Sequence, residues 1–579
     1  MVSSIVNAGI LVVFVLVVTS IVPNSFSISL IGFGLCIISI CLKQPNSFLD
    51  RATKQLNHRT LVTLIFAWVL LIILAGCVNA WARFVSPGYD LYWFTQAITQ
   101  AKTSGILKTS SERFYSTMLM QHWEPILYSA VPLAFVVKSS VLSALWQGLG
   151  FLIGSLGAFK LSQFLFSQTK YLRMQYVTTA LFVWSFATIN PLSFDVHPPV
   201  FGGLLFIPWI IYCIVTQKNK IIPVILLLLL AQCGEVFLAI FTTYVGYLFV
   251  QHKVTFSRVI LSVLAIASGY LILSFYQKYL GPWWSDLPYN YASRYGNIGG
   301  DGFGIISNFI QHPLYVLSQV FEKEKIKTFL KILLYSGPFF IFSFKSSQYA
   351  RLSFFILLGC IPYFLQAGLS SYNLLYATNT HYIGALGSQW WALTTLGLYA
   401  FLTEDIFQKM RSLCFKTSVV SLILSFFFLN SSEWRKSPIY PFRGVFEREI
   451  SAKNVRNYLE NLDKRKGILF IDTEWLCPIA AFERPWIICN DGSGYFDKIP
   501  LDVVVVRENS LEQFYNRLSE NSKNSMNGKV LQELILQSKN SFVISSWQEK
   551  FSSSQKPHKD RPIFYRIYER QQMNKGEAL

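Results

Sequence analysis

The chain has 579 residues, of which 52% are hydrophobic, 16% aromatic and only 14% charged. A soluble domain carries about 25% charged residues, so this composition excludes a soluble globular protein and indicates a membrane protein. The net charge of +19 comes from Lys and Arg in short clusters between apolar runs. This dispersal argues against a nucleic-acid partner, because nucleic-acid-binding proteins gather their basic residues on one face.

Apolar runs begin at the N-terminus and continue to residue 430. Residues 1–22 lack a basic segment and a small-residue cleavage site, so we predict a retained N-terminal helical hairpin over residues 1–42 and not a cleaved signal peptide. Since ~20 helical residues cross a bilayer, the runs predict about thirteen membrane spans. The predicted spans are residues 5–22, 27–42, 60–80, 139–167, 175–192, 200–216, 222–234, 236–250, 258–276, 329–344, 351–369, 386–402 and 417–430.

Clusters of Lys and Arg lie in the short loops between these runs, for example Lys218/Lys220 and Lys253/Arg258. Such clusters mark cytoplasmic loops and predict a cytoplasmic N-terminus, with longer outer loops at 81–138 and 277–328. The alternation holds only when the apolar run 221–250 is divided into two short helices near its QCGE sequence. One long tilted helix is the alternative, and it breaks the charge pattern.

From about Ser431 the sequence becomes polar, and strand-like segments such as GILFID, PWIICN, DVVVV and SFVISS alternate with predicted helices. This alternation predicts a small C-terminal α/β domain over residues 431–579, which is extracytoplasmic because an odd number of spans precedes it. Residues 43–430 form the transmembrane core, so the predicted fold class is mainly α. Of the nine cysteines, only Cys477 and Cys489 lie in the polar part, where one disulfide is an open alternative.

A few ionisable residues are predicted to lie at the outer face, next to the ends of spans. Ionisable groups at this depth are costly unless they are paired or hydrated, so they mark candidate functional sites. Carboxylates and imidazoles together suit general-base chemistry or a divalent metal, and a helix cap is the structural alternative for each residue. The candidates are Asp90 and Glu235 as catalytic residues, and His122, Glu124, Asp195 and His197 as metal or substrate ligands.

Aromatic side chains crowd the same predicted face, and an interfacial belt explains most of them. Contact with a sugar or a lipid chain is the functional alternative. Arginines on outer segments could bind the phosphate of a lipid-linked donor or anionic head groups. The segment GNIGGDGFG at 296–304 predicts a flexible loop, because no strand precedes it and no helix evidently follows. The residues concerned are Tyr89, Trp93, Trp123, Trp283 and Trp284 for lipid or sugar contact, and Arg83, Arg113 and Arg294 for the donor phosphate.

Several short motifs resemble those of a family of bacterial polytopic membrane proteins, classed as a domain of unknown function and placed near the GT-C glycosyltransferases. The family pattern YDLGIFDQ is similar to residues 89–96, where Tyr92 and Thr95 replace the glycine and the second acid. The pattern HFxPIL resembles residues 122–127, and FDFHP resembles residues 194–198.

The resemblance implies a GT-C-like fold and a glycosyltransferase in the plasma membrane that takes a sugar from a polyprenyl phosphate at the outer face. In this interpretation Asp90 activates the acceptor hydroxyl or holds a divalent metal, and the partners are membrane lipids and the polyprenyl-phosphate sugar. Two alternatives stay open. One is a lipid or solute translocator, and the other is a degenerate envelope protein that lost its activity with the acid replaced by Thr95.

Overall fold

The structure is a computed structural model, and the part of the chain that it describes is mostly helical. The described residues are 58–82, 90–107, 119, 123–169, 171–172, 174–185, 188–189, 191–192, 196–217, 221–276, 279, 290–300, 302–336, 339–346, 348–371, 383–404, 461–462, 468–471, 487–489, 501–507, 510–518, 520–539, 547–555 and 563–570.

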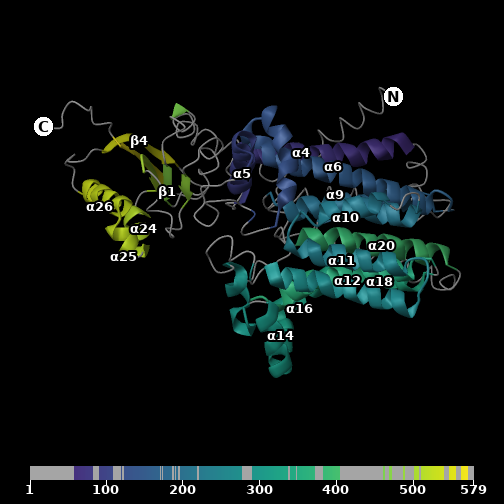
Figure 1. The fold of residues 1–579 in the computed structure, drawn as a ribbon. Helices are drawn as coiled ribbons and strands as arrows, with labels where there is room; N and C mark the ends of the chain where they lie inside the picture. The colour runs from purple at the N-terminus through teal and green to yellow at the C-terminus, as the bar shows by residue number, and fades with distance from the viewer. Residues whose placement is uncertain are drawn as a thin grey trace. The chain divides into compact units, whose positions relative to one another are not determined.

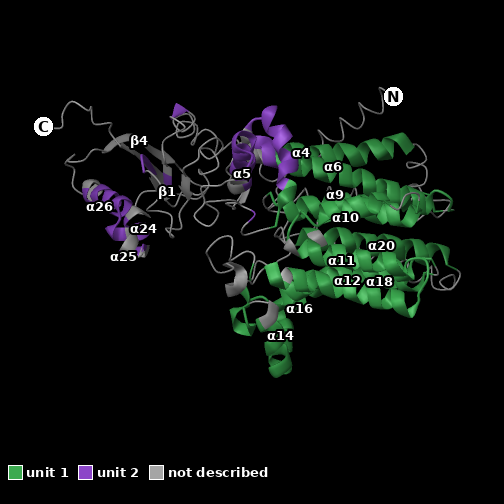
Figure 2. Cartoon of the chain, viewed as in Figure 1, with its two compact units in different colours: residues 1–77, 122–126, 144–443 green, residues 78–121, 127–143, 444–579 purple. Residues whose placement is uncertain are grey.

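The chain divides into two compact units, and the first contains residues 1–77, 122–126 and 144–443 (Figure 2). Its long helices lie side by side (Figure 1). The helices wholly or mostly in this unit are α4 (His58–Ala82), α6 (Ser139–Phe166), α7 (Met174–Trp184), α9 (Pro198–Thr216), α10 (Ile221–Leu230), α11 (Glu235–Val250), α12 (Phe256–Phe275), η4 (Asn290–Ile298), α14 (Gly302–Gln311), α15 (Pro313–Val320), α16 (Lys323–Ser336), α17 (Phe339–Phe342), η5 (Ser343–Lys345), α18 (Ala350–Leu369) and α20 (Gly384–Thr403).

Among the described helices, three are long and apolar enough to cross a membrane: Val141–Phe166, Pro198–Thr216 and Ala350–Leu369. Shorter apolar helices accompany them, including α10 with 10 residues and α11 with 16. The run 221–250 is divided, as predicted, because Gly234 takes a φ of 137°, which favours glycine. The predicted spans 5–22, 27–42 and 417–430 lie outside the described residues.

Glycines on α6 let it approach α9 closely. A Cβ built on Gly154 would lie 1.9 Å from the backbone oxygen of Leu204, and one on Gly150 would lie 2.5 Å from the ring of Phe201. Trp146 stacks on the same ring, with centroids 3.9 Å apart. Small residues permit this kind of backbone contact between membrane helices. The contact fixes the first half of α9 against α6.

At one end of the first unit, the end of α11 contacts the start of α18. The guanidinium of Arg351 donates hydrogen bonds to the carbonyls of Val250 at 2.6 Å and Gln251 at 2.9 Å. Tyr399, near the end of α20, contacts the ring of Tyr349 at the start of α18. Helices α11 and α20 therefore end where α18 begins, and α11 and α20 both begin at the opposite end of the unit.

The regions predicted as long outer loops contain helices. The loop 277–328 includes η4, α14, α15 and the start of α16, and the loop 81–138 includes α5 (Asp90–Ser104) and η2 (Pro125–Phe135). The prediction of a flexible loop at 296–304 is wrong, since η4 extends to Ile298 and α14 begins at Gly302. Short amphipathic helices acquire most of their stability from packing, which a local pattern does not reveal.

The second unit contains residues 78–121, 127–143 and 444–579. Its sheet has the strand order β2-β1-β3-β5-β4, with β1 parallel to β2 and β3, and β5 antiparallel to β3 and β4. Leu469, Val504, Phe514 and Leu531 form part of a buried core that joins strands to helices. The elements of this C-terminal part are β1 (Ile468–Ile471), β2 (Ile487–Cys489), β3 (Val503–Arg507), α24 (Ser510–Arg517), α25 (Glu520–Asn524), α26 (Met526–Lys539), β4 (Trp547–Gln555) and β5 (Ile563–Arg570).

Candidate functional site

Residues from separate segments meet at the end of the first unit where α9, α11 and α20 begin. The backbone N–H of Ile126 donates to the carbonyl of Gln232 at 3.3 Å, so the segment around Glu124 lies against the turn between α10 and α11. A Cβ built on Gly202 of α9 would lie 2.6 Å from the Cβ of Cys233 in that turn. The turn is therefore held between α9 and the start of η2.

Glu124 is buried at this meeting point, with 2% of its surface exposed. Cys233, in the adjacent turn, is fully buried, and a thiol buried in apolar surroundings is unreactive. Glu124 and not Cys233 is therefore the residue here that can bind a substrate or exchange a proton with it.

His197 lies at the N-cap of α9 and is also buried, with 6% of its surface exposed. Its backbone N–H donates to the side-chain oxygen of Gln147 on α6 at 2.8 Å. Pro198 and Pro199 follow it in the first turn, where the missing N–H of proline costs no helical hydrogen bond. The sequence therefore fixes the start of α9, and His197 with it, against α6.

Three helix N-termini converge at this end. A Cβ built on Gly234 would lie 3.4 Å from Pro199, and one on Gly384 would lie 3.3 Å from Val200. The N-cap residues His197, Gly234 and Ile383 make no side-chain capping hydrogen bond. Helix N-termini carry a partial positive charge and N–H groups without helical partners, so this arrangement favours an anion.

We call Glu124, His197 and Cys233 the polar cluster. The backbone of Glu235, the first residue of α11, directly follows the turn that contains Cys233. The structure thus brings together the segments of three residues that the sequence singles out. His122 and Asp195 lie outside the described residues, as does the side chain of Glu235. Within the described part of the chain, no group of three His, Cys, Asp or Glu side chains is arranged to hold a metal ion.

Asp90 is the first residue of α5 and belongs to the second unit. Its side chain lies outside the described residues, so its catalytic role stays a prediction. Thr95, one turn further along α5, is buried and its Oγ1 lies 2.6 Å from the Oγ of Ser143. The position where the family pattern has its second acid is therefore filled here by a hydroxyl in a buried hydrogen bond.

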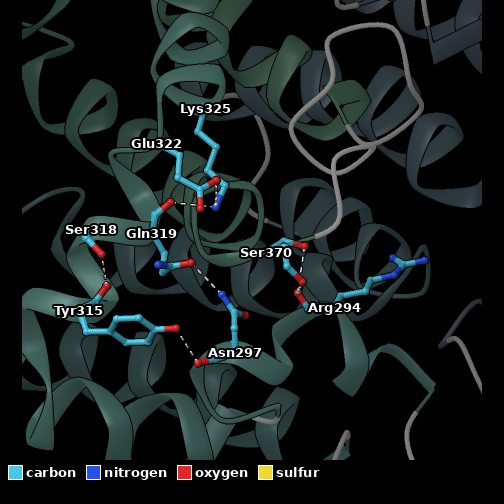
Figure 3. Close-up of polar contacts among 9 residues, drawn as sticks. Arg294, Asn297, Tyr315, Ser318, Gln319, Glu322, Lys325 and Ser370 are labelled. Carbon is cyan, nitrogen blue, oxygen red and sulfur yellow. Dashed lines mark hydrogen bonds and ion pairs between the residues drawn. The ribbon is translucent and has the colours of Figure 1, made fainter.

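Arg294 is in η4, and its backbone carbonyl accepts hydrogen bonds from the N–H of Ser371 at 2.8 Å and from the Oγ of Ser370 at 3.3 Å. Its side chain extends away from these contacts (Figure 3). Arg294 therefore connects η4 to the end of α18, at the same end of the unit as the polar cluster. The remaining predicted contact residues, Tyr89, Arg83, Arg113, Trp283, Trp284 and the side chain of Trp93, lie outside the described residues, whereas Trp123 is half-buried beside Glu124.

Sequence reasoning did not identify Gln147 or Cys233. Gln147 lies within the apolar run 139–167 and is 2% exposed. A buried amide in such a run signals a specific hydrogen-bond partner, because polar groups in hydrocarbon are costly when they lack one. Cys233 carries no such signal, since a buried thiol behaves as a small apolar side chain.

A protein family described as "Predicted membrane protein (DUF2079)" matches residues 80–462, which include the polar cluster and end before β1. A comparison with curated proteins found no match. Among solved structures, the chain is similar to ArnT from Cupriavidus metallidurans bound to undecaprenyl phosphate, with a TM-score of 0.40 and 10% identity over 78% of this chain and 95% of that chain. The apo state of ArnT has a TM-score of 0.38 and 8% identity over 86% of this chain and 98% of that chain.

Proposed function

Because the chain belongs to the DUF2079 family of predicted membrane proteins, we propose that it is an integral membrane glycosyltransferase of the GT-C type. It transfers a sugar from a polyprenyl-phosphate donor to an acceptor hydroxyl at the outer face of the plasma membrane. The observation that carries the proposal is the buried polar cluster at one end of the helices. About thirteen spans and an extracytoplasmic C-terminal α/β domain are part of the same proposal.

The reaction needs a base for the acceptor and stabilisation of the leaving phosphate. The acceptor oxygen loses its proton to a carboxylate and bonds to the anomeric carbon, while the bond from that carbon to the phosphate oxygen breaks and the polyprenyl phosphate leaves as an anion. Asp90 and Glu235 are the proposed catalytic carboxylates, and Glu124 and His197 the proposed substrate ligands. The converging starts of α9, α11 and α20 support the proposed phosphate position.

The test is turnover by the full-length protein in detergent with a panel of polyprenyl-phosphate sugars. Removing a positioned carboxylate that acts on the substrate costs about 10²-fold or more, so we expect Asp90→Asn and Glu124→Gln to lower turnover by that factor. Glu324→Gln is the matched control, because this carboxylate is 64% exposed and paired with Lys327 on α16. Equal turnover in wild type and Asp90→Asn would remove Asp90 from the chemistry.

A lipid or solute translocator is the second candidate, and one observation favours it. The hydroxyls of Tyr244, Tyr363 and Ser388 are buried within α11, α18 and α20 and have no hydrogen-bond partner among the described residues. Buried hydroxyls of this kind can line a polar path through a bundle. Movement of a labelled lipid or solute across vesicles that contain the protein, without sugar release from any donor, would support the translocator and contradict the transferase.

A further inference from the structure

Helices α14 and α15 expose an apolar stripe that the first unit leaves uncovered. Its residues lie at positions 306, 309 and 310 on α14 and at 314 and 317 on α15, spacings that place each set along one face of its own helix, and Phe321 directly follows α15. An exposed apolar patch of this kind marks a site of contact with a partner or a membrane. The stripe consists of Ile306 (55% exposed), Phe309 (46%), Ile310 (74%), Leu314 (81%), Leu317 (40%) and Phe321 (66%).

A polar stripe runs beside the apolar one on α14. Ser307 and Gln311 are both exposed, and the side-chain nitrogen of Gln311 lies 3.3 Å from the hydroxyl of Ser307. Each follows directly after an apolar stripe residue, Ile306 or Ile310. A helix that exposes an apolar face and a polar face together is typical of helices that lie in the plane of the membrane interface.

The direction of α14 agrees with such a position. Figure 1 shows α14 running across the direction of the long helices of its unit and projecting beyond them. A helix parallel to the spans would bury its stripe in hydrocarbon over its whole length. A helix across the spans keeps one face toward the acyl chains and the other toward the head groups.

A hydrogen-bond network attaches α15 and α16 to η4 (Figure 3). The side-chain amide of Asn297 donates to Gln319 at 2.8 Å, and the hydroxyl of Tyr315 donates to the Asn297 carbonyl at 3.3 Å. The Lys325 ammonium donates to the Gln319 carbonyl at 2.8 Å and lies 3.3 Å from the Glu322 carboxylate. Since η4 is attached to the end of α18, the stripe lies at the same end of the unit as the polar cluster.

Helices α15 and α16 also pack against α18, a helix long and apolar enough to cross a membrane. Phe329 of α16 contacts Phe364 of α18 with ring centroids 5.4 Å apart, and a Cβ on Gly368 would lie 3.2 Å from Val320 of α15. Leu365, next to this contact, is 44% exposed. The end of α15 therefore lies against the part of α18 that exposes Leu365.

We propose that α14 and α15 lie in the interfacial layer of the bilayer, with the apolar stripe among the acyl chains and Ser307 and Gln311 at the level of the head groups. The occupant of the stripe is lipid. This contact fixes the height of the polar cluster relative to the membrane surface, because η4, α15 and α16 join the stripe to the end of α18.

Spin labels on neighbouring residues test this position. The full-length protein, with its native cysteines replaced, would carry a label at Ile310→Cys or at Gln311→Cys and be reconstituted in vesicles of phosphatidylethanolamine and phosphatidylglycerol. We expect the label at position 310 to collide several-fold more often with oxygen, and several-fold less often with a water-soluble nickel chelate, than the label at position 311.

Two outcomes would overturn the proposal. Equal and high collision rates with the nickel chelate at both positions would place the stripe in water. Protection of position 310 from both reagents would place another protein segment on the stripe. Ile310 and Gln311 are both exposed, so the labelled proteins keep the fold, and an unchanged thermal unfolding midpoint verifies this.

Discussion

Gln147 is the residue that connects the polar cluster to the helix packing below it. It is buried on α6 and accepts the backbone N–H of His197, the residue at which α9 begins. A buried N–H that loses its acceptor costs about 1–3 kcal/mol. The position of the His197 imidazole therefore depends on a neutral amide that takes no part in the proposed chemistry.

The substitution Gln147→Leu tests this connection. It removes the acceptor, so we expect the protein to lose about 1–3 kcal/mol of stability and to lose turnover through displacement of His197. Gln175→Leu is the matched control, because Gln175 is buried on α7 and its side-chain oxygen has no partner among the described residues. Thermal unfolding in detergent gives the comparison, and equal midpoints for the two variants would show that the hydrogen bond does not position α9.

The ionisable members of the cluster could be predicted from the sequence, and Gln147 could not. Glu124 and His197 are conspicuous because charged and imidazole groups are rare beside apolar runs. The partner of a glutamine inside such a run depends on which helices pack together, and one sequence does not contain that information. For the same reason the sequence predicts neither the contact of the segment around Glu124 with the Cys233 turn nor the Thr95 to Ser143 hydrogen bond.

The turn between α10 and α11 determines how the cluster is assembled. Gly234 ends the turn with a φ of 137°, and Glu235 begins α11 directly after it. The charge pattern of the sequence predicts this division. It does not predict α14, α15 or η4, because their short apolar stripes resemble the scattered apolar residues of a loop.

The contact between α9 and this turn can be tested with Gly202→Ala. The added Cβ would lie 2.6 Å from the Cβ and 2.7 Å from the Sγ of Cys233, so the turn has to move away from α9. We expect a loss of about 1–3 kcal/mol of stability, as for other overpacked sites, together with reduced turnover.

Gly76→Ala is the control for this change, since a Cβ on Gly76 of α4 meets no atom within 4 Å. Alanine also favours a helix by about 1 kcal/mol relative to glycine, so the control should unfold at the same temperature as wild type or higher. A Gly202→Ala protein that unfolds like the control would mean that the turn has room to shift at no cost.

The chain passes between the two units more than once. Residues 78–121, which include Asp90, group with residues 444–579, whereas the segment 122–126 groups with the helices. The domain boundaries predicted from composition, at residues 42 and 430, follow hydropathy alone. Hydropathy shows where the chain enters an apolar environment and does not show which segments share contacts.

The predicted sidedness of the C-terminal domain can be tested with reporter fusions. A reporter fused after Ser431 should be active as alkaline phosphatase and dark as a fluorescent protein that folds only in the cytoplasm, because an odd number of spans precedes it. The same reporters fused after Lys253, in a basic loop predicted to be cytoplasmic, should give the opposite result. Cytoplasmic signals from both fusions would contradict the proposed extracytoplasmic C-terminal domain.

The shortness of α10 has a consequence for how the chain enters the membrane during synthesis. A helix of 10 residues is about 15 Å long, half of the ~30 Å hydrocarbon core. We therefore expect the insertion machinery to retain α10 until α11 has emerged, and to release both into lipid as one hairpin folded at Gly234. The ribosome must then have translated Val250 before the turn that contains Cys233 can reach its final position beside α9.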